Sequence, residues 1–178
     1  MTAYPQHLIR KMTLADGTIV TLRPIRPSDA GIEQAFVREL SDESRYFRFM
    51  DMLRELSPQM LKQLTEIDYD THMAFIAVVD EPAGEREVAV GRYVGMPDGA
   101  ECEFAIVVAD RWQNKGIAWE LMHLLIEAAR THGFARMCGD ILASNRKMLD
   151  FVRELGFALA MDERDPRQIK ATLALNSA

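Results

Sequence analysis

The sequence predicts an α+β fold with one central mixed, mostly antiparallel β-sheet flanked by helices. Three apolar runs between residues 73 and 108, separated by short turns, are typical of an antiparallel meander. A long amphipathic pattern over residues 116–132 then separates two strand patterns, which indicates a helical crossover between parallel strands. A further helix pattern and two short strand patterns close the chain, so strands and helices share one sheet.

The N-terminal part predicts a hairpin and three helices. The hairpin consists of residues 8–12, an Asp16-Gly17 turn and residues 18–22. Ser28 and Asp29 are expected to cap a helix that reaches about Leu40. A second helix begins within residues 41–44, and Ser57-Pro58 opens a third that ends before Asp68.

The meander comprises strands at residues 73–79, 88–94 and 102–108. Pro82 and Gly84 mark the first turn between them, and Pro97-Asp98-Gly99 marks the second. After the helix at 116–132, Gly133 stands where a helix C-cap belongs. The remaining predicted elements are a strand at 135–142, a helix at 146–155 ended by Gly156, and strands at 157–161 and 169–175.

Composition and charge restrict the class of protein. Apolar residues make up 48% and charged residues 27% of the 178 residues, which is ordinary for one globular domain, here 1–178 with a core of about 19–175. The net charge of −6 disfavours nucleic acid as a partner. No bilayer-length apolar run or secretory signal is evident, so we expect a cytoplasmic protein without a membrane partner. Cys102 and Cys138 are expected to be buried thiols, and no metal-ligand spacing occurs.

The segment from Val108 to Ala118 predicts an anion site. A buried strand ends there, a polar loop follows, and a long helix begins with small residues. Backbone N–H groups at a helix start are unpaired, and the helix dipole adds partial positive charge. Gly116 and Ala118 would let an anion approach the backbone around Ile117, while Gln113, Asn114 and Lys115 would add donors. A diphosphate is the expected ligand, although ordinary helix capping explains the same residues.

Two motifs give this segment a family resemblance. Gln113-x-x-Gly116-x-Ala118 resembles the acetyl-CoA pyrophosphate loop of the GCN5-related N-acetyltransferases, the GNAT superfamily. Asn145-x-x-Met148, ending in Leu155-Gly156-Phe157, resembles the helix that flanks the pantetheine arm in that family. The resemblance covers about residues 19–175 and implies the family's three-layer fold, acetyl-CoA as cosubstrate, and Asn145 as a cofactor-binding residue.

A closer resemblance is to the catalytic domain of bacterial Pat-type protein lysine acetyltransferases. It is carried by residues 22–29, 41–49, 64–70 and 103–108. The resemblance implies transfer of an acetyl group to an amine acceptor, with a lysine-bearing protein as the expected partner. Many Pat-type proteins fuse this domain to a synthetase-like or nucleotide-sensing region. The resemblance of the catalytic domain does not imply that such a region regulates this protein.

The reaction requires a base, and Glu103 is the expected catalytic residue. It stands within an apolar strand pattern, where a carboxylate is costly to bury without a partner or a role. Glu101 is the second candidate, and a solvent-facing or salt-bridged Glu103 is the alternative. Backbone N–H groups at Ile106, Val107 and Val108 are expected to bind the pantetheine and polarise the thioester.

The sequence also allows other functions and mechanisms. Family members often carry a tyrosine seven residues after the asparagine as general acid, but this chain has Val152 there, preceded by Phe151. That substitution keeps a non-catalytic acyl-CoA sensor as an alternative, alongside an acetyltransferase for small amines. Cys102 as a nucleophile lacks a histidine placed to activate it. The sequence leaves open whether two copies form a homodimer.

Overall fold

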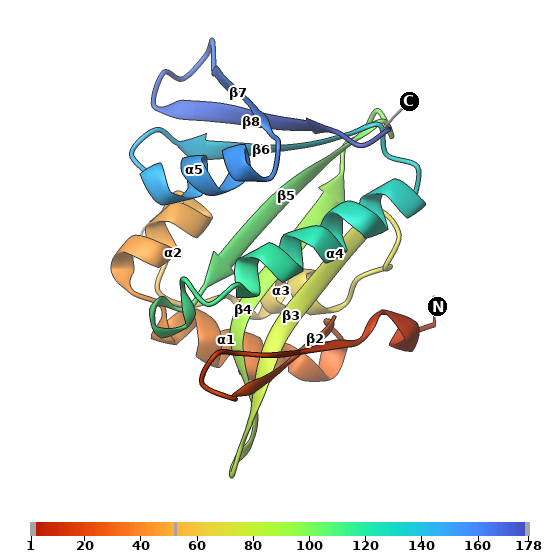
Figure 1. Cartoon of the computed structure of the whole chain (residues 1–178), viewed down its shortest axis with the longest axis vertical. Helices are drawn as coiled ribbons and strands as arrows, with labels where there is room; N and C mark the ends of the chain where they lie inside the picture. The colour runs from red at the N-terminus through yellow and green to blue at the C-terminus, as the bar shows by residue number, and fades with distance from the viewer. Residues whose placement is uncertain (1–2, 52, 177–178) are drawn as a thin grey trace.

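The computed structural model describes residues 3–51 and 53–176, which form an eight-stranded sheet with helices on both faces (Figure 1). The strand order is β1-β2-β3-β4-β5-β6-β8-β7. Residues 1–2, 52 and 177–178 of the expected domain lie outside the described residues.

The strands are β1 (Arg10–Thr13), β2 (Ile19–Pro24), β3 (His72–Glu81), β4 (Gly84–Gly95), β5 (Glu101–Val108), β6 (Arg136–Leu142), β7 (Ala158–Met161) and β8 (Gln168–Ala174). The α-helices are α1 (Ala30–Glu39), α2 (Asp42–Phe49), α3 (Pro58–Thr65), α4 (Ile117–Thr131) and α5 (Arg146–Glu154), and three short 3-10 turns are η1 (Gln6–Leu8), η2 (Pro27–Asp29) and η3 (Asp110–Trp112).

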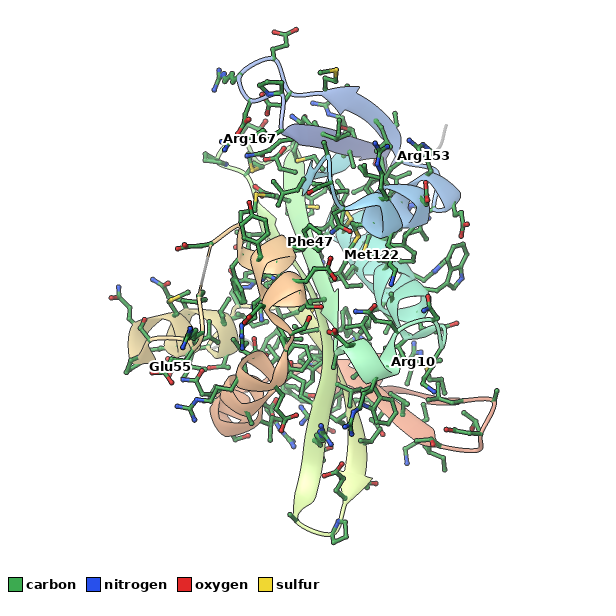
Figure 2. The ribbon with its side chains drawn as sticks, turned by 90° about the vertical axis from the view of Figure 1, so that its left-hand side faces the viewer. Arg10, Phe47, Glu55, Met122, Arg153 and Arg167 are labelled. Atoms are coloured by element: carbon green, nitrogen blue, oxygen red, sulfur yellow. The ribbon has the colours of Figure 1, made fainter. Side chains whose placement is uncertain are left out.

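Two apolar layers hold the sheet between its helices. The buried stripe of α4, including Leu121 and Leu125, packs on one face of the sheet. Phe36 and Val37 of α1 pack on the other face. Figure 1 shows α4 in front of β3–β5 and α1 with α3 behind them, and Figure 2 shows Met122 inside the molecule between α4 and the strands. The predicted three-layer α+β fold is confirmed.

The sheet divides between β5 and β6. These two strands are parallel, but they pair only from Glu101 to Glu103, and Figure 1 shows them diverging beyond that point. Phe104 occupies the point of divergence and packs directly on Gly139 of β6, where an added Cβ would lie 2.5 Å from the ring. A glycine is therefore required at position 139, because any side chain would displace this ring.

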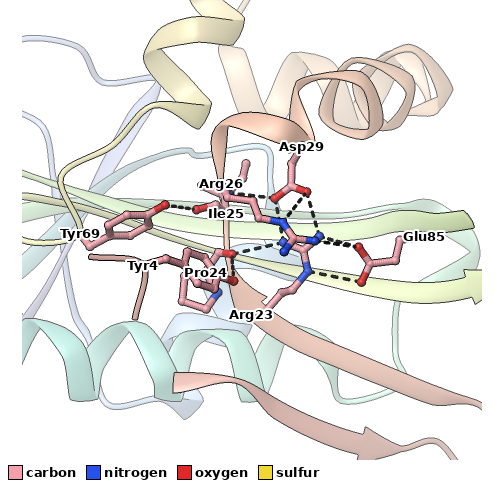
Figure 3. Close-up of polar contacts among 8 residues, drawn as sticks. All are labelled: Tyr4, Arg23, Pro24, Ile25, Arg26, Asp29, Tyr69 and Glu85. Carbon is pink, nitrogen blue, oxygen red and sulfur yellow. Dashed lines mark hydrogen bonds and ion pairs between the residues drawn. The ribbon is translucent and has the colours of Figure 1, made fainter. Parts of the chain in front are cut away.

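The entry to α1 differs from the expected cap. Residues 27–29 form η2, and the Asp29 carboxylate does not cap α1. It instead accepts a bidentate pair of hydrogen bonds from Arg23, at 2.7 and 2.9 Å, and a third bond from the backbone N–H of Arg26 (Figure 3). Arg23 also donates to Glu85, so the buried guanidinium ties β2 to η2, directly before α1, and to β4. Charge pairing outcompeted capping here because both groups are buried.

The two cysteines are free and buried, as expected. In the parallel ladder Cys102 lies opposite Met137, and Cys138 lies opposite Glu103. Since directly paired residues share a face of the sheet, the two thiols point to opposite faces. No helix within the described part of the chain is both long and apolar enough to cross a membrane.

Candidate active site

A cavity of about 760 Å³ opens where β5 and β6 diverge. Its walls are β5, the loop from Asp110 to Gly116, the first turn of α4, the inner side of α5, and α2. Of the predicted site residues, Glu103, Ile106, Val107, Val108, Gln113, Asn114, Gly116, Ile117, Ala118 and Asn145 all line this cavity. Residues far apart in the sequence therefore meet because the sheet splits.

The loop before α4 presents a run of unpaired backbone donors. Asn114 and Gly116 both adopt left-handed backbone conformations, with φ of 60° and 87°. Among the residues that the structure describes, no protein acceptor is found for the backbone N–H groups of residues 114–119. The first protein-bonded N–H after the loop is that of Glu120, which donates to the carbonyl of Gly116. A row of free amides at the start of a fifteen-residue helix attracts a polyanion.

Three predicted polar side chains have defined positions. The Gln113 side-chain amide donates to the carbonyl of Val108 at 3.1 Å, so it ties the loop to the end of β5. The Asn145 carboxamide accepts from the N–H of Met148 and caps α5. Lys115 alone among the predicted residues does not line the cavity, since its charge lies toward Asp16 of the β1–β2 turn. Its free backbone N–H, rather than its side chain, belongs to the row of unpaired amides at the helix start.

One edge of β5 is free inside the cavity. Ile106, Val107 and Val108 pair with β4 on one side, opposite Gly91, Val90 and Ala89. On the other side, pairing with β6 stops at Glu103. The strand therefore offers unpaired main-chain groups to an extended ligand lying between β5 and β6, as an added strand would use them.

Glu103 lies at the inner end of this free edge. Its side chain is exposed to the cavity, on the same face as Cys138 and, two residues further along β6, Asp140. Partial burial and the Asp140 carboxylate raise the pKa of Glu103, whereas the Arg48 and Lys170 cations oppose that rise. Glu101 lies outside this wall and pairs with Arg136 at 2.6 Å. Of the two candidate carboxylates, only Glu103 therefore lines the cavity.

The structure adds wall residues to those predicted from the sequence. Phe47 and Arg48 of α2 line the cavity opposite β5, and Asp140 lines it from β6. The Arg48 guanidinium lies 4.8 Å from the centre of the Phe49 ring. Burial and nearby Arg92 lower the pKa of Arg48 to about 10, so Arg48 remains cationic at neutral pH. A charged residue within the apolar strand 136–142 was the one available signal for Asp140.

The wall carries carboxylates for acid–base chemistry, and it also holds the Ser44 hydroxyl, which donates to Asp110 at 2.8 Å. The described residues lining the cavity include no tyrosine, histidine or cysteine. Val152, at the family's tyrosine position, is fully buried. Burial and the nearby Cys138 raise the pKa of Cys102 to about 12, which leaves it protonated and unreactive. In the described part of the chain, no group of three or more His, Cys, Asp or Glu side chains is placed to hold a metal ion.

A sheet split beside a helix start, with free amides at one end of the gap and a carboxylate at the other, is the arrangement expected of a transferase whose donor is an extended, phosphate-bearing molecule. Residues 20–158 match the family model described as "Acetyltransferase (GNAT) domain". The chain belongs to the GNAT acetyltransferase family, and it is an acetyl-CoA-dependent acyltransferase. The family uses acetyl-CoA as cosubstrate.

Relatives and solved structures agree with this assignment. The chain is 40% identical to acetyltransferase PA5475 of Pseudomonas aeruginosa over 92% of this chain and 88% of that one. It is 33% identical to acetyltransferase Pat of Mycolicibacterium smegmatis, over 76% of this chain but only 40% of Pat. The crystal structure of the GNAT domain of S. lividans PAT superposes with a TM-score of 0.86 at 26% identity, covering 97% of this chain and 99% of that domain. The resemblance to the Pat catalytic domain is confirmed.

Proposed function

We propose that this protein transfers an acetyl group from acetyl-CoA to the side-chain amine of a protein lysine, with Glu103 as general base. One observation carries the proposal: a single cavity joins the free amides of residues 114–119 to the Glu103 carboxylate along the unpaired edge of β5. The similarity to Pat and to the PAT domain supports this class of reaction.

The chain's groups divide between the donor and the acceptor. We assign the diphosphate to the backbone from Gln113 to Ala118, including the N–H groups of Asn114, Lys115, Gly116 and Ile117. Ile106, Val107 and Val108 would hydrogen-bond the pantetheine through the main chain, and Asn145 would flank it from α5. The free amides and the cavity volume are compatible with that extended donor.

The proposed role of Glu103 is to accept a proton from the acceptor amine. A lysine amine with a pKa of about 10.4 is neutral in about one molecule in 2,500 at pH 7, a handicap of about 4.6 kcal/mol. A carboxylate that accepts the proton, directly or through water, offsets part of that handicap. The amine would then attack the thioester directly, because Cys102 is buried and protonated and Cys138 does not line the cavity.

The acceptor end carries the charges expected for a cationic substrate. Glu103, Asp140 and Glu43 contribute carboxylates to the wall, against the single guanidinium of Arg48 on α2. The chain as a whole has a net charge of −6, which favours approach by a lysine-rich surface. We further propose that residues 1–178 act as one domain in the cytoplasm, in keeping with two free buried thiols.

Release of free thiol from acetyl-CoA tests the proposal. The wild-type chain would be incubated with a lysine-rich protein, with the same protein after chemical acetylation of its lysines, and with a panel of polyamines and amino acids. The proposal predicts thiol release with the unmodified protein and none above background with the blocked one. Turnover confined to the small amines would show that the protein-lysine assignment is wrong.

A further inference from the structure

Trp119 is an exposed aromatic side chain at the mouth of the cavity. It is the third residue of α4, it lines the cavity, and 39% of its surface is exposed. The large apolar side chains that follow on the same helix, Leu121, Met122 and Leu125, are buried. An indole left uncovered beside a ligand cavity offers a broad apolar face to whatever enters.

The ring is held in place by neighbours on two helices. Its centroid lies 4.8 Å from that of His123 and 6.5 Å from that of Phe151, at interplanar angles of 45° and 69°. His123 is itself fixed by a 2.8 Å hydrogen bond between its Nδ1 and the carbonyl of Trp119. A ring immobilised before binding loses little conformational entropy when a ligand contacts it.

The order of groups along the cavity determines what reaches this ring. Glu103 lies at the inner end, the free edge of β5 follows, and the unpaired amides of residues 114–119 come next. The donor is a linear molecule in which the thioester, pantetheine, diphosphate and nucleoside follow in that order. With the thioester at Glu103 and the diphosphate at the amides, the nucleoside must leave the cavity beside the first turn of α4, where Trp119 lies.

A cation on α5 lines the same cavity. Lys147, at the start of α5, is exposed and lines the cavity. Within residues 3–51 and 53–176, its ammonium group makes no ion pair or hydrogen bond. An aromatic ring and an ammonium that line one cavity, from α4 and α5, suit a ligand that carries both a purine and a phosphate on its ribose.

We infer that Trp119 is the stacking platform for the adenine of coenzyme A and that Lys147 binds the 3′-phosphate of its ribose. This inference rests on the proposed binding of acetyl-CoA in the cavity. It adds a recognition site for the nucleoside, outside the reacting centre, that would allow the protein to distinguish the complete coenzyme from pantetheine-bearing fragments.

Calorimetry with three ligands separates the contributions: coenzyme A, dephospho-coenzyme A without the 3′-phosphate, and 4′-phosphopantetheine without the nucleotide. Trp119→Ala is expected to weaken the first two roughly tenfold and to leave the third unchanged. Trp119→Phe should keep most of the affinity. Lys147→Ala should weaken only coenzyme A, roughly fivefold. Met161→Ala, which trims another exposed apolar side chain that does not line the cavity, is the control and should change nothing.

The outcomes distinguish this inference from the proposed function. If wild-type protein binds coenzyme A and Trp119→Ala binds it equally well, the adenine platform is wrong while the acetyltransferase site stands. An equal loss for all three ligands would mean that the substitution deforms the helix start, and it would also overturn the inference. No binding of coenzyme A by the wild-type chain would remove both proposals.

Discussion

Glu103 and Cys138 are the last paired residues between β5 and β6. The parallel ladder ends with them, and the cavity begins directly beyond. The base that we propose therefore stands at the vertex of the split, where an extended ligand entering between the strands must stop. The point at which β5 and β6 stop pairing therefore determines where the proposed reaction takes place.

Replacement of Glu103 tests its role most simply. Glu103→Gln keeps the size of the side chain and removes the proton acceptor, so kcat should fall by about 10²- to 10⁴-fold. The affinity for coenzyme A should not change, because the diphosphate site is distant along the cavity. Glu101→Gln is the matched control, since it breaks only a partly exposed ion pair with Arg136 and should remain near wild-type rate. Wild-type turnover by Glu103→Gln would exclude it as the base.

The protonation of Glu103 should depend on its neighbours in the cavity. Burial and Asp140 raise its pKa above the ordinary 4.5, while Arg48 and Lys170 lower it. Carboxyl ¹³C NMR, with the resonance assigned by its loss in Glu103→Gln, should show a midpoint above 4.5. Asp140→Asn should lower that midpoint, and Arg48→Gln should raise it. Because only the ionised carboxylate accepts a proton, the acidic limb of activity should move in the same directions. Unmoved midpoints in both variants would contradict the described charge environment.

The helix start offers a matched pair of glycines. Gly116 and Gly133 flank α4 and both have left-handed φ values, 87° and 84°, so a side chain strains the backbone similarly at either end. Gly116→Glu adds bulk and negative charge at the proposed diphosphate site and should weaken coenzyme A binding at least 100-fold. Gly133→Glu should destabilise the protein about as much as Gly116→Glu does, but it should bind coenzyme A normally. Equal affinities of the two variants would place the diphosphate elsewhere.

Packing of Phe104 on Gly139 should be important for stability. A Cβ at position 139 would lie 2.5 Å from the Phe104 ring, so Gly139→Ala should reduce the free energy of unfolding by about 1–3 kcal/mol in urea titrations. Gly31→Ala is the opposite control, because this helical glycine faces open space and should gain about 0.5–1 kcal/mol. A neutral Gly139→Ala would mean that the ring moves without cost.

The buried carboxylate of Glu87 should make stability depend on pH. Burial and nearby Glu33 raise its pKa well above the ordinary 4.5. A group whose pKa is higher in the folded state stabilises the fold below its unfolded pKa, and this contribution is lost as pH rises through the folded-state value. Glu87→Gln should therefore flatten the decline in unfolding free energy above pH 4.5, while the exposed Glu127→Gln should not. An unchanged slope in Glu87→Gln would rule out a buried proton on this residue.

Local signals allowed most of the fold to be predicted. The strands at 73–79, 88–94 and 102–108 are bounded by turn residues and mostly buried, and the resulting meander is confirmed. The placement of β8 between β6 and β7 depends on pairing among distant strands, which periodicity does not report. The cap expected at Asp29 is wrong because Arg23, six residues earlier, provides a buried partner that no local pattern reveals.

The site likewise contains some residues that local sequence motifs identify and others that only the tertiary structure brings to the cavity. Gly116, Ala118 and Glu103 belong to contiguous motifs, and the structure brings them to one cavity. Arg48, Asp140 and Trp119 reach that cavity only through the packing of α2, the divergence of β6 and the orientation of α4. Their positions depend on tertiary structure, which no local sequence pattern reports.

A crystal structure of the wild-type protein with coenzyme A tests the central claim most directly. We predict that the diphosphate oxygens accept hydrogen bonds from backbone N–H groups between Gln113 and Trp119, with the pantetheine between β5 and β6 and its sulfur pointing toward Glu103. Coenzyme A bound elsewhere on the molecule, or a cavity that stays empty at saturating ligand, would contradict the account.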